Sequence, residues 1–587
     1  MSLPVTWAAK HGAVASTRVA NSFISYVLPA EVGAIAGPKE RVTRRKPRWL
    51  LTSAATEAIL GRSSAYHVKV SIRLCVLAVF ASTCIFGDQR GALLNPWAVH
   101  NEIQVDRSAS ASVKAFFPSF REYQNLILYH PKFGYYSSGR VDFVNDFRTF
   151  PSALYPYFGH MIAEQIFRMW DGMRKAGTLG ERFTIAEFGA GDGALAESIL
   201  SYVGVQAAKD PEHWQPFSQQ LMYASYDRSP AMSDLQRKRN AKFGARFEAR
   251  ESNAIAPAIA HGSLTGVVLS NELPDTFGVH KVLFSVDGSA EVAFTVPYIS
   301  SERYSLIEPE LPKSLKQRLR EENLAIPKKL FHSEPAGTIF LSREGLTSVL
   351  EAISRSADSR RKLEAIEFHE IYLPAETVPE VAAHIRKYAE HYAIQVARGG
   401  RSLVAYINLD EGRFLRNAGE ILKAGYVLTI DYGGNWNTIS EPDVDRLRAF
   451  GPGSDAKDAK ENAAHTNPYY WPTLNDVTSD VNFSHMADEG KETGLEPIFF
   501  GPQVNLLLGT GLRLEEVPES SNKTFFQWVS NFFNWQAYKV LIERKAGTDP
   551  AYVFPRPGSE PLQVGLETLS PEKQPLARKI RDRLRAQ

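Results

Sequence analysis

The sequence predicts an α/β protein whose core is a parallel, Rossmann-like sheet. Three short, mostly apolar runs carry this prediction, and polar residues follow each of them. The first run ends in the glycine-rich turn of 185–195, the second covers 219–226 before Asp227, and the third covers 266–270 before Asn271. Such runs are typical of strands buried on both faces of a parallel sheet. Because the carboxyl ends of parallel strands meet at one edge, we expect the polar residues to form one site.

The glycine-rich turn predicts a nucleotide-like cofactor. Gly189, Gly191 and Gly193 have no Cβ, so a ligand can approach the backbone, and the next helix offers unpaired N–H groups. The spacing fits the dinucleotide fingerprint, with Ala194 in its last position, and equally the turn that binds S-adenosylmethionine. Glu187 favours S-adenosylmethionine, because a carboxylate repels a pyrophosphate but attracts a sulfonium and an ammonium.

Asp227 supports the same prediction, since an acidic residue after the second strand of such a fold usually binds ribose hydroxyls. An equal alternative is that Asp227 caps the helix that starts near Pro230. The gap between the first two strands is about 40 residues instead of ~20. We interpret the segment 207–216, which contains Pro211 and Pro216, as an inserted loop that accounts for the excess.

Further motifs follow one another in a recognisable order. They are LYHPKFGYYS at 128–137, DFRTFP at 146–151 with Phe158 and Gly159, EFGAGDGAL at 187–195, DRSP at 227–230, NELPD at 271–275, DYG at 431–433, and DVT and VNF within 476–483. This order resembles the MidA-type class I methyltransferases. That group includes the mitochondrial protein-arginine methyltransferase that assists assembly of respiratory complex I. The resemblance covers roughly residues 115–545.

The resemblance implies S-adenosylmethionine as the cofactor and assigns the site. The residues implied to bind the cofactor are Glu187, Gly189, Gly191, Gly193, Asp227, Asp146 and Thr149. Asn271, Glu272 and Asp275 are expected to line the methyl-acceptor side, with Glu272 the first choice to pair with an arginine guanidinium. The resemblance also implies a protein substrate, a subunit of respiratory complex I, and no metal. His130, His160 and His280 are not needed as bases.

Several positions depart from the family pattern. Asn145 replaces a glycine, Ser152 replaces a glutamate, Asp192 stands where arginine is frequent, Gly278 replaces a proline and Asn482 replaces an aspartate. The changes at Ser152 and Asn482 support an alternative, a non-catalytic assembly or scaffold protein on the same fold. A dinucleotide-dependent oxidoreductase is a third hypothesis, favoured only by Ala194.

The chain divides into five predicted parts. These are an N-terminal extension at 1–110, a first methyltransferase segment at 111–300, a helical insertion at 301–400 for substrate selection, a second methyltransferase segment at 401–548 and a tail at 549–587. Helices are expected at 121–130 and 151–175, before the first strand of the sheet. The formal net charge of +2 argues against nucleic-acid binding over the whole surface.

The N-terminal extension suggests a targeting segment. No acidic residue occurs before Glu31, and a basic cluster runs from Lys39 to Arg48. This composition suits a mitochondrial or plastid transit segment, and an unstructured basic tail is the alternative. We expect a mitochondrial protein, with a cytoplasmic location as the alternative. The apolar run 74–86 is shorter than the ~20 residues that span a bilayer, so membrane association through it is not favoured. The two cysteines, Cys75 and Cys84, both lie in this run and support neither a disulfide framework nor a zinc site.

Overall fold

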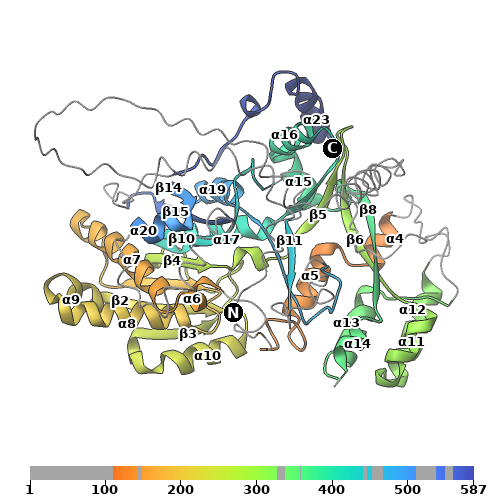
Figure 1. Ribbon diagram of the computed structural model, residues 1–587, viewed down its shortest axis with the longest axis horizontal. Coiled ribbons are helices and arrows are strands. Elements are labelled where there is room, and N and C mark those ends of the chain that lie inside the picture. The colour runs from red at the N-terminus through yellow and green to blue at the C-terminus, as the bar shows by residue number, and fades with distance from the viewer. Residues whose placement is uncertain are drawn as a thin grey trace, which may run out of the picture. The chain divides into compact units, whose positions relative to one another are not determined.

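The computed structural model describes residues 110–139, 141, 149–326, 337–356, 358–439, 446–451, 467–509, 537–548 and 559–587. The predicted targeting segment and the apolar run 74–86 lie outside these residues. Within the described ranges, an eight-stranded sheet has the order β14-β15-β10-β4-β1-β2-β3, with β13 beside β10 (Figure 1). Its strands are β1 (Phe183–Phe188), β2 (Leu221–Asp227), β3 (Phe247–Glu251), β4 (Leu264–Asn271), β10 (Leu422–Gly434), β13 (Val481–Asn482), β14 (Leu495–Pro502) and β15 (Tyr538–Lys545).

The directions of these strands define the class of the fold. The five strands from β3 to β10 run parallel, β15 is antiparallel to β10, and β14 is antiparallel to β15. A parallel sheet needs helical crossovers, which must cover both of its faces. The predicted Rossmann-like sheet is therefore confirmed.

Alternate residues of each strand pack against helices on opposite faces, as the period of two requires. Ile185 and Val267 pack in a core with α7 (Tyr157–Ala176), α8 (Ala194–Lys209) and α9 (Pro211–Gln220). Their neighbours Ala186 and Val268 pack instead with α17 (Leu409–Ile421) and α19 (Phe483–Lys491). The remaining helices of this part are α6 (Phe150–Ala153), α10 (Pro230–Asn240) and α20 (Gln503–Gly509).

A second, antiparallel sheet is inserted between β4 and α17. Its order is β7-β6-β5-β9, with β8 paired to β6 (Figure 1). The strands are β5 (His280–Phe284), β6 (Ala290–Ile299), β7 (Ile339–Phe340), β8 (Glu367–Pro374) and β9 (Leu403–Ile407). The predicted insertion at 301–400 thus contains a sheet as well as helices, and the sheet extends beyond both predicted boundaries.

Helices cover both faces of the second sheet. Val282 and Phe294 pack in a core with α15 (Pro379–Lys387), α16 (Ala389–Gly399) and α23 (Gln574–Ala586). The adjacent Leu283 and Ala293 pack with α5 (Phe120–Tyr129), α12 (Lys313–Ala325) and α13 (Arg343–Ile353). The predicted C-terminal tail therefore contributes a packed helix, α23. The other elements here are α4 (Ser110–Phe116), α11 (Ser301–Ile307) and α14 (Ser359–Leu363).

The interpretation of 207–216 as an inserted loop is wrong. The segment completes α8 and begins α9, with Pro211 in the first turn of α9. A proline is tolerated there because its missing N–H would have had no partner within the helix. Trp214 and Phe217 of α9 are buried in the core beside α7. The helices expected at 121–130 and 151–175 correspond to α5 and to α6 with α7.

None of the helices within the described ranges combines the length and the apolarity that crossing a membrane requires.

Candidate functional site at the carboxyl edge of the sheet

The register of the central strands brings the predicted site residues to one edge of the main sheet. Glu187 near the end of β1 lies opposite Ser225 of β2 and Leu269 of β4. Asn271 at the end of β4 lies opposite Ile430 of β10. Asp227, which ends β2, Glu272 and Asp431 therefore follow at the same edge, which is where open α/β sheets bind their ligands.

The glycine turn has the backbone that its sequence predicts. Gly189, Gly191 and Gly193 have φ values of 71°, 52° and 81°, in the left-handed region that favours glycine. A Cβ on Gly189 would lie 2.7 Å from Leu273 Cδ1, so a side chain there would clash. Asp192 accepts a hydrogen bond from the Ala194 N–H at 3.1 Å, at the start of α8.

Two buried side chains of α10 hold this turn in place. Gln236 donates to the Gly191 carbonyl at 2.9 Å and to Asp227 at 3.3 Å, and it accepts from Ser225 at 2.7 Å. Asn240 donates to the Gly193 carbonyl at 3.1 Å. Both side chains are fully buried. Gln236 therefore joins the glycine turn to the residue predicted to bind ribose, although the sequence analysis did not select it.

Glu187 is a buried carboxylate with one hydrogen-bond partner described. The Tyr223 hydroxyl donates to it at 2.7 Å. Burial raises the pKa of Glu187 to about 7, the Tyr223 hydrogen bond opposes this, and the negative charges of Asp192 and Asp227 add to it. A buried, repelled carboxylate is stabilised by a cation. Its surroundings therefore fit a ligand that carries an ammonium.

Asp227 lies beside Glu187 and is partly exposed. Burial raises its pKa to about 6, while the Ser229 N–H, 2.9 Å away, and the Gln236 side chain lower it. The alternative role of Asp227 as the cap of α10 is wrong, because Ser229 is the N-cap and accepts from Met232. The strand β3 ends next to Asp227, and the Ser252 N–H donates to the Asp227 carbonyl at 2.8 Å.

Three carboxyl groups gather at the ends of β4 and β10. Glu272 accepts hydrogen bonds from the Phe150 N–H and from Asn271, both at 3.1 Å. Asp431 accepts from the Asp275 N–H at 3.2 Å. Asp275 and Asp431 are buried, whereas Glu272 keeps some exposure. The predicted acceptor-side residues are thus brought together, with Glu272 the most accessible of the three carboxyls.

Burial and mutual repulsion disfavour ionisation of this group. Burial raises the pKa of Glu272 to about 8, with a further increase from Asp275, while the Phe150 N–H opposes it. Burial also raises the pKa of Asp275 and of Asp431, and the charges of Asp275 and Glu272 raise that of Asp431 further. Carboxyls that share a site in this way are stabilised by a bound cation.

Glu272 also has an unusual backbone. Its φ of 50° is one of three positive values at non-glycine residues in the described chain. The left-handed conformation costs roughly 1–3 kcal/mol for such a residue and is found most often at functional sites. The Glu272 N–H donates to the Ile430 carbonyl at 2.8 Å, which fixes this conformation between the two strands.

The N-terminal motif at 128–137 links the two halves of the edge. The Tyr129 hydroxyl bonds to Thr276 Oγ1 at 2.6 Å, next to Asp275. The Ser229 hydroxyl donates to the Tyr136 carbonyl at 3.2 Å, next to the cofactor residues. Tyr129 and Tyr136 stack at 5.7 Å between their ring centroids, and the Arg228 guanidinium lies 4.1 Å from the Tyr129 centroid. These tyrosines were not among the predicted site residues.

Two cofactor predictions fall at or beyond the limit of the described residues. Asp146 lies outside them. Thr149 precedes Phe150, whose N–H bonds to Glu272, and its hydroxyl is 3.3 Å from that of Ser152. Thr149 thus lies beside the acceptor carboxyls, and its contact with the cofactor stays a prediction. No cluster of three or more His, Cys, Asp or Glu side chains suited to a metal ion occurs among the residues that the structure describes.

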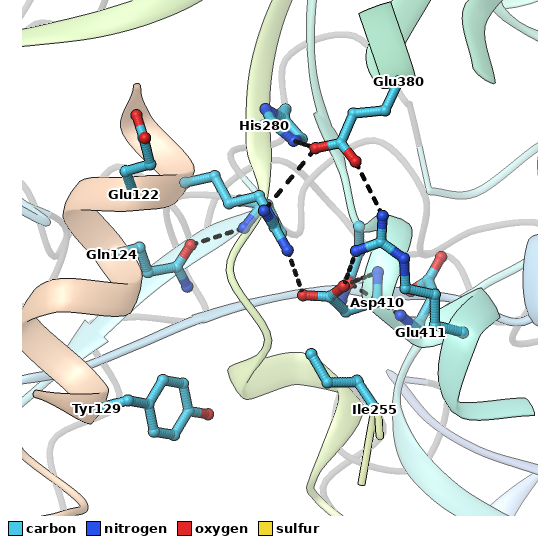
Figure 2. A network of polar contacts seen from close by, with 12 residues as sticks. Glu122, Gln124, Tyr129, Ile255, His280, Glu380, Asp410 and Glu411 are labelled. Carbon is cyan, nitrogen blue, oxygen red and sulfur yellow. Dashed lines mark hydrogen bonds and ion pairs between the residues drawn. The ribbon is translucent and has the colours of Figure 1, made fainter. Parts of the chain in front are cut away.

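A charged network fixes the second sheet next to this edge (Figure 2). Asp410, at the start of α17, contacts Arg121 of α5 at 2.7 Å and Arg413 at 2.6 Å. Arg413 also contacts Glu380 of α15 at 2.8 Å, and Glu380 lies 3.5 Å from His280 Nε2. His280 belongs to this structural network, consistent with the expectation that it is not a base.

Two side-chain hydrogen bonds to backbone groups also join α17 and α5 to the segment that follows Glu272. Asn408, the N-cap of α17, donates to the Pro274 carbonyl at 2.8 Å, one residue from Asp275. The Gln124 side chain accepts from the Val279 N–H at 3.0 Å, between α5 and the start of β5 (Figure 2). The chain therefore leaves the predicted acceptor-side residues directly into the second sheet.

A protein-family comparison identifies the class of this fold and site. Residues 161–501 match the model of the family described as "Putative S-adenosyl-L-methionine-dependent methyltransferase". The match spans more than half of the chain, so the protein belongs to this family, and the resemblance to MidA-type methyltransferases is confirmed. Its cofactor is S-adenosylmethionine. The dinucleotide hypothesis, which depended on Ala194, is therefore not supported.

Solved structures give more distant similarities. A Burkholderia thailandensis protein bound to S-adenosyl-homocysteine is 18% identical, with a TM-score of 0.49 over 77% of this chain and 95% of that one. A native structure from the same organism is 18% identical, with a TM-score of 0.47 over 77% and 97%. Geranyl diphosphate C-methyltransferase from Streptomyces coelicolor is 8% identical, with a TM-score of 0.25 over 66% and 77%. A search of curated proteins found no match.

The residues at the edge fit this cofactor. Gly189, Gly191 and Gly193 of the turn carry no side chain, so a ligand can approach the backbone of the turn closely. Glu187 and Asp227 supply carboxylates for an ammonium and for ribose hydroxyls. Gly189, Gly191, Gly193, Glu187 and Asp227 are thus the residues suited to hold S-adenosylmethionine, and the contacts themselves stay a prediction.

Proposed function

We propose that this methyltransferase modifies a guanidinium nitrogen of arginine in a protein substrate. The cluster of Glu272, Asp275 and Asp431 is the observation that supports this acceptor. Carboxyls so close together in a partly buried site are poorly ionised alone and gain most from a bound cation. A guanidinium suits them best, because its planar donors can pair with two carboxylate oxygens at once.

The protein residues have separate tasks in this proposal. S-adenosylmethionine supplies the electrophilic methyl group when bound. The ionised Glu272 pairs with the acceptor guanidinium, orients it and favours a lone pair on one nitrogen. The proton released from that nitrogen on methylation passes to the Glu272 carboxylate, because its burial favours the protonated form. Asn271 and the Phe150 N–H hold Glu272 in place.

We further propose a mitochondrial role in assembly of respiratory complex I. The support comes from the family resemblance and from the acid-poor, basic N-terminal sequence. On this proposal the substrate is a subunit of complex I. Tritium-methyl transfer to a mitochondrial extract, compared with a cytosolic extract, would test both points, since label confined to the cytosolic fraction would contradict them.

Calorimetry and a methyl-transfer assay test the proposed reaction. S-adenosyl-homocysteine should bind the full chain, and a failure to bind at millimolar ligand would contradict the assignment of the cofactor site. Glu272→Gln should bind it within about twofold of the unmodified protein, because Glu272 lies on the acceptor side. Its methyl transfer should fall by about 100-fold or more, as expected for loss of a positioned base. Unchanged transfer would remove Glu272 from the mechanism.

The second candidate function is a non-catalytic assembly protein that binds the cofactor. Ser152 favours it, because its hydroxyl bonds to the Thr149 carbonyl at 2.9 Å where the family pattern has a glutamate. Restoring that group with Ser152→Glu gives a direct comparison. If both proteins bind S-adenosyl-homocysteine but only the variant transfers methyl groups, the assembly function is correct and the arginine proposal fails for the natural chain.

A further inference from the structure

Arg448 is a cation placed next to the acceptor carboxyls, and neither the family motifs nor the predicted site includes it. It lies on β11 (Leu447–Phe450), which pairs with β12 (Asp476–Ser479) in a two-stranded sheet. Its guanidinium is 4.5 Å from the centre of the Tyr432 ring. Its side chain is only 24% exposed, so solvent screens its charge weakly.

Asp480 holds Arg448 in this position. One Asp480 oxygen is paired with Arg448, and the other lies 2.9 Å from Arg446. The Asp480 N–H donates to the Arg446 carbonyl at 3.1 Å. This backbone hydrogen bond, at the end of the two-stranded sheet of β11 and β12, fixes the position of Asp480. Burial lowers the pKa of Arg448, but Asp480 and Tyr432 outweigh this and raise it, so Arg448 stays charged.

Tyr432 connects Arg448 to the acceptor side. Its hydroxyl is hydrogen-bonded to Thr478 of β12. Its N–H donates to Asp431 at 2.8 Å, and Asp431 also accepts from the Asp275 N–H at 3.2 Å. Although burial raises the pKa of Asp275, the Tyr432 hydrogen bond and the charge of Arg448 both lower it. Arg448 therefore favours the ionised form of a carboxyl that burial and its neighbours would otherwise keep protonated.

Other charged or titratable groups face this arrangement from every element packed around it. They are Glu272 after β4, Asp275 in the turn after it, Asp431 and Tyr432 of β10, Arg446 and Asp480 beside the hairpin, Asp476 of β12, Tyr538 of β15, and Tyr129, Tyr136 and Arg228 from the N-terminal motif and the turn after β2. Three of these described groups are cations, namely Arg228, Arg446 and Arg448. The guanidinium of Arg448 lies over the Tyr432 ring.

We propose that Arg448, anchored by Asp480, is a positioning residue of the acceptor site that acts through Tyr432 and Asp275 and sets the pH range in which the site binds a cationic acceptor. This inference rests on the proposed arginine acceptor. It makes two opposite predictions for removal of Arg448. Near pH 6.5 the carboxyls should be protonated more fully and bind a cation less well. Near pH 9 the carboxyls are ionised more fully in both proteins, and loss of the repelling arginine should leave binding equal or stronger.

The probe is N-acetyl-arginine amide, titrated into the full chain with saturating S-adenosyl-homocysteine from pH 5.5 to pH 9. For Arg448→Met we expect the probe to bind about tenfold more weakly at pH 6.5, which corresponds to a shift of about one pH unit. At pH 9 its affinity should equal or exceed that of the unmodified protein. Arg448→Lys should restore most of the affinity at pH 6.5, since it keeps the charge. Arg446→Met is the matched control, because Arg446 pairs with the same Asp480, whereas the guanidinium over the Tyr432 ring is that of Arg448. The pH profile of Arg446→Met should not move.

The outcomes separate the inference from the proposed function. If the unmodified protein does not bind the probe at any pH, the arginine acceptor itself is contradicted. If it binds and Arg448→Met follows the same pH profile, or weakens binding equally at pH 6.5 and pH 9, the role of Arg448 is contradicted. A shift of equal size in Arg446→Met would also overturn it. Affinity for S-adenosyl-homocysteine should stay within twofold in all three variants.

Discussion

At the scale of single residues, the structure brings several of the predicted residues to one edge of the sheet, together with side chains that hold them. Glu187, Asp227, Glu272 and Asp275 could be predicted because they directly follow or end apolar strands, a local pattern. Gln236 could not, because its role depends on how α10 lies against the glycine turn. A glutamine two turns into a helix gives no local sign of such a contact.

Replacement of Gln236 should weaken cofactor binding without reaching the acceptor side. Gln236→Ala removes hydrogen bonds to Gly191, Ser225 and Asp227. We expect affinity for S-adenosyl-homocysteine to fall by about tenfold, since a lost hydrogen bond in a buried network costs about 1 kcal/mol or more. Arg237→Ala is the control at the next position, where the side chain is exposed and pairs with the exposed Asp234. Equal affinities by calorimetry would contradict the role of Gln236.

At the scale of elements, contacts between helices explain why particular residues occur in the sequence motifs. Gly159 of the family's F-G pair lies where α7 crosses α8, and a Cβ there would overlap the Ser198 hydroxyl and lie 2.6 Å from Ser198 Cβ. The glycine is therefore explained by close packing of two helices. Packing between helices also explains why the prediction of a loop at 207–216 is wrong. The two prolines indicated a loop, but Trp214 and Phe217 pack in the core and stabilise a helix there.

Two glycines of the same helix pair should respond oppositely to alanine. Gly159→Ala should lower the free energy of unfolding by about 1–3 kcal/mol, because the core is overpacked. Gly204→Ala in α8 should raise it by about 0.5–1 kcal/mol, since no atom lies within 4 Å of the new Cβ and helical glycine is unfavourable. Urea unfolding of both variants checks this contrast, and changes of the same sign would contradict it.

The strand β15 carries a buried acid, Glu543, whose two carboxyl oxygens lack a hydrogen-bond partner in the described structure. Burial raises its pKa well above the ordinary 4.5. The contribution of Glu543 to the free energy of unfolding is therefore fully present below pH 4.5, where the group is protonated in both states. This contribution is lost as the pH rises through the pKa of Glu543 in the folded protein.

Glu543→Gln should consequently match the natural protein near pH 4.5 and exceed its stability at pH 8 by about 1–3 kcal/mol. The measurement is urea unfolding across this pH range. Glu496→Gln on the neighbouring strand β14 is the control, because Glu496 is exposed and pairs with Arg544. A constant difference between Glu543→Gln and the natural protein at every pH would show that Glu543 is not protonated in the folded state.

At the scale of the whole molecule, the described chain contains two large sheets joined beside the site, together with the two-stranded sheet of β11 and β12. Three central strands of the main sheet, β1, β2 and β4, could be predicted, because they are apolar runs with polar ends. The second sheet was not predicted, since helices separate β6, β7, β8 and β9 along the chain, and of its paired strands only β5 and β6 follow each other without a helix between them. Asp410 joins the layers around both sheets through Arg121 and Arg413 (Figure 2).

Asp410→Ala should uncouple the two sheets. The change leaves two arginines without a carboxylate that lies almost fully buried between them, and we expect a loss of roughly 3 kcal/mol. Thermal unfolding should broaden or divide into two transitions, with the second sheet melting first. Lys132→Ala is the control, because Lys132 and Glu351 form an exposed pair worth at most about 1 kcal/mol. A single sharp transition with an unchanged midpoint would contradict the coupling.

The backbone of Glu272 has a consequence for how this protein can evolve. A glycine would adopt its φ of 50° without strain, so selection for folding alone would favour replacement of the very residue proposed to handle the acceptor's proton. A descendant that kept the fold but lost its reaction should therefore drift to glycine here early. Among the relatives of this chain, the amino acid at this position would then distinguish active methyltransferases from proteins that have lost the activity.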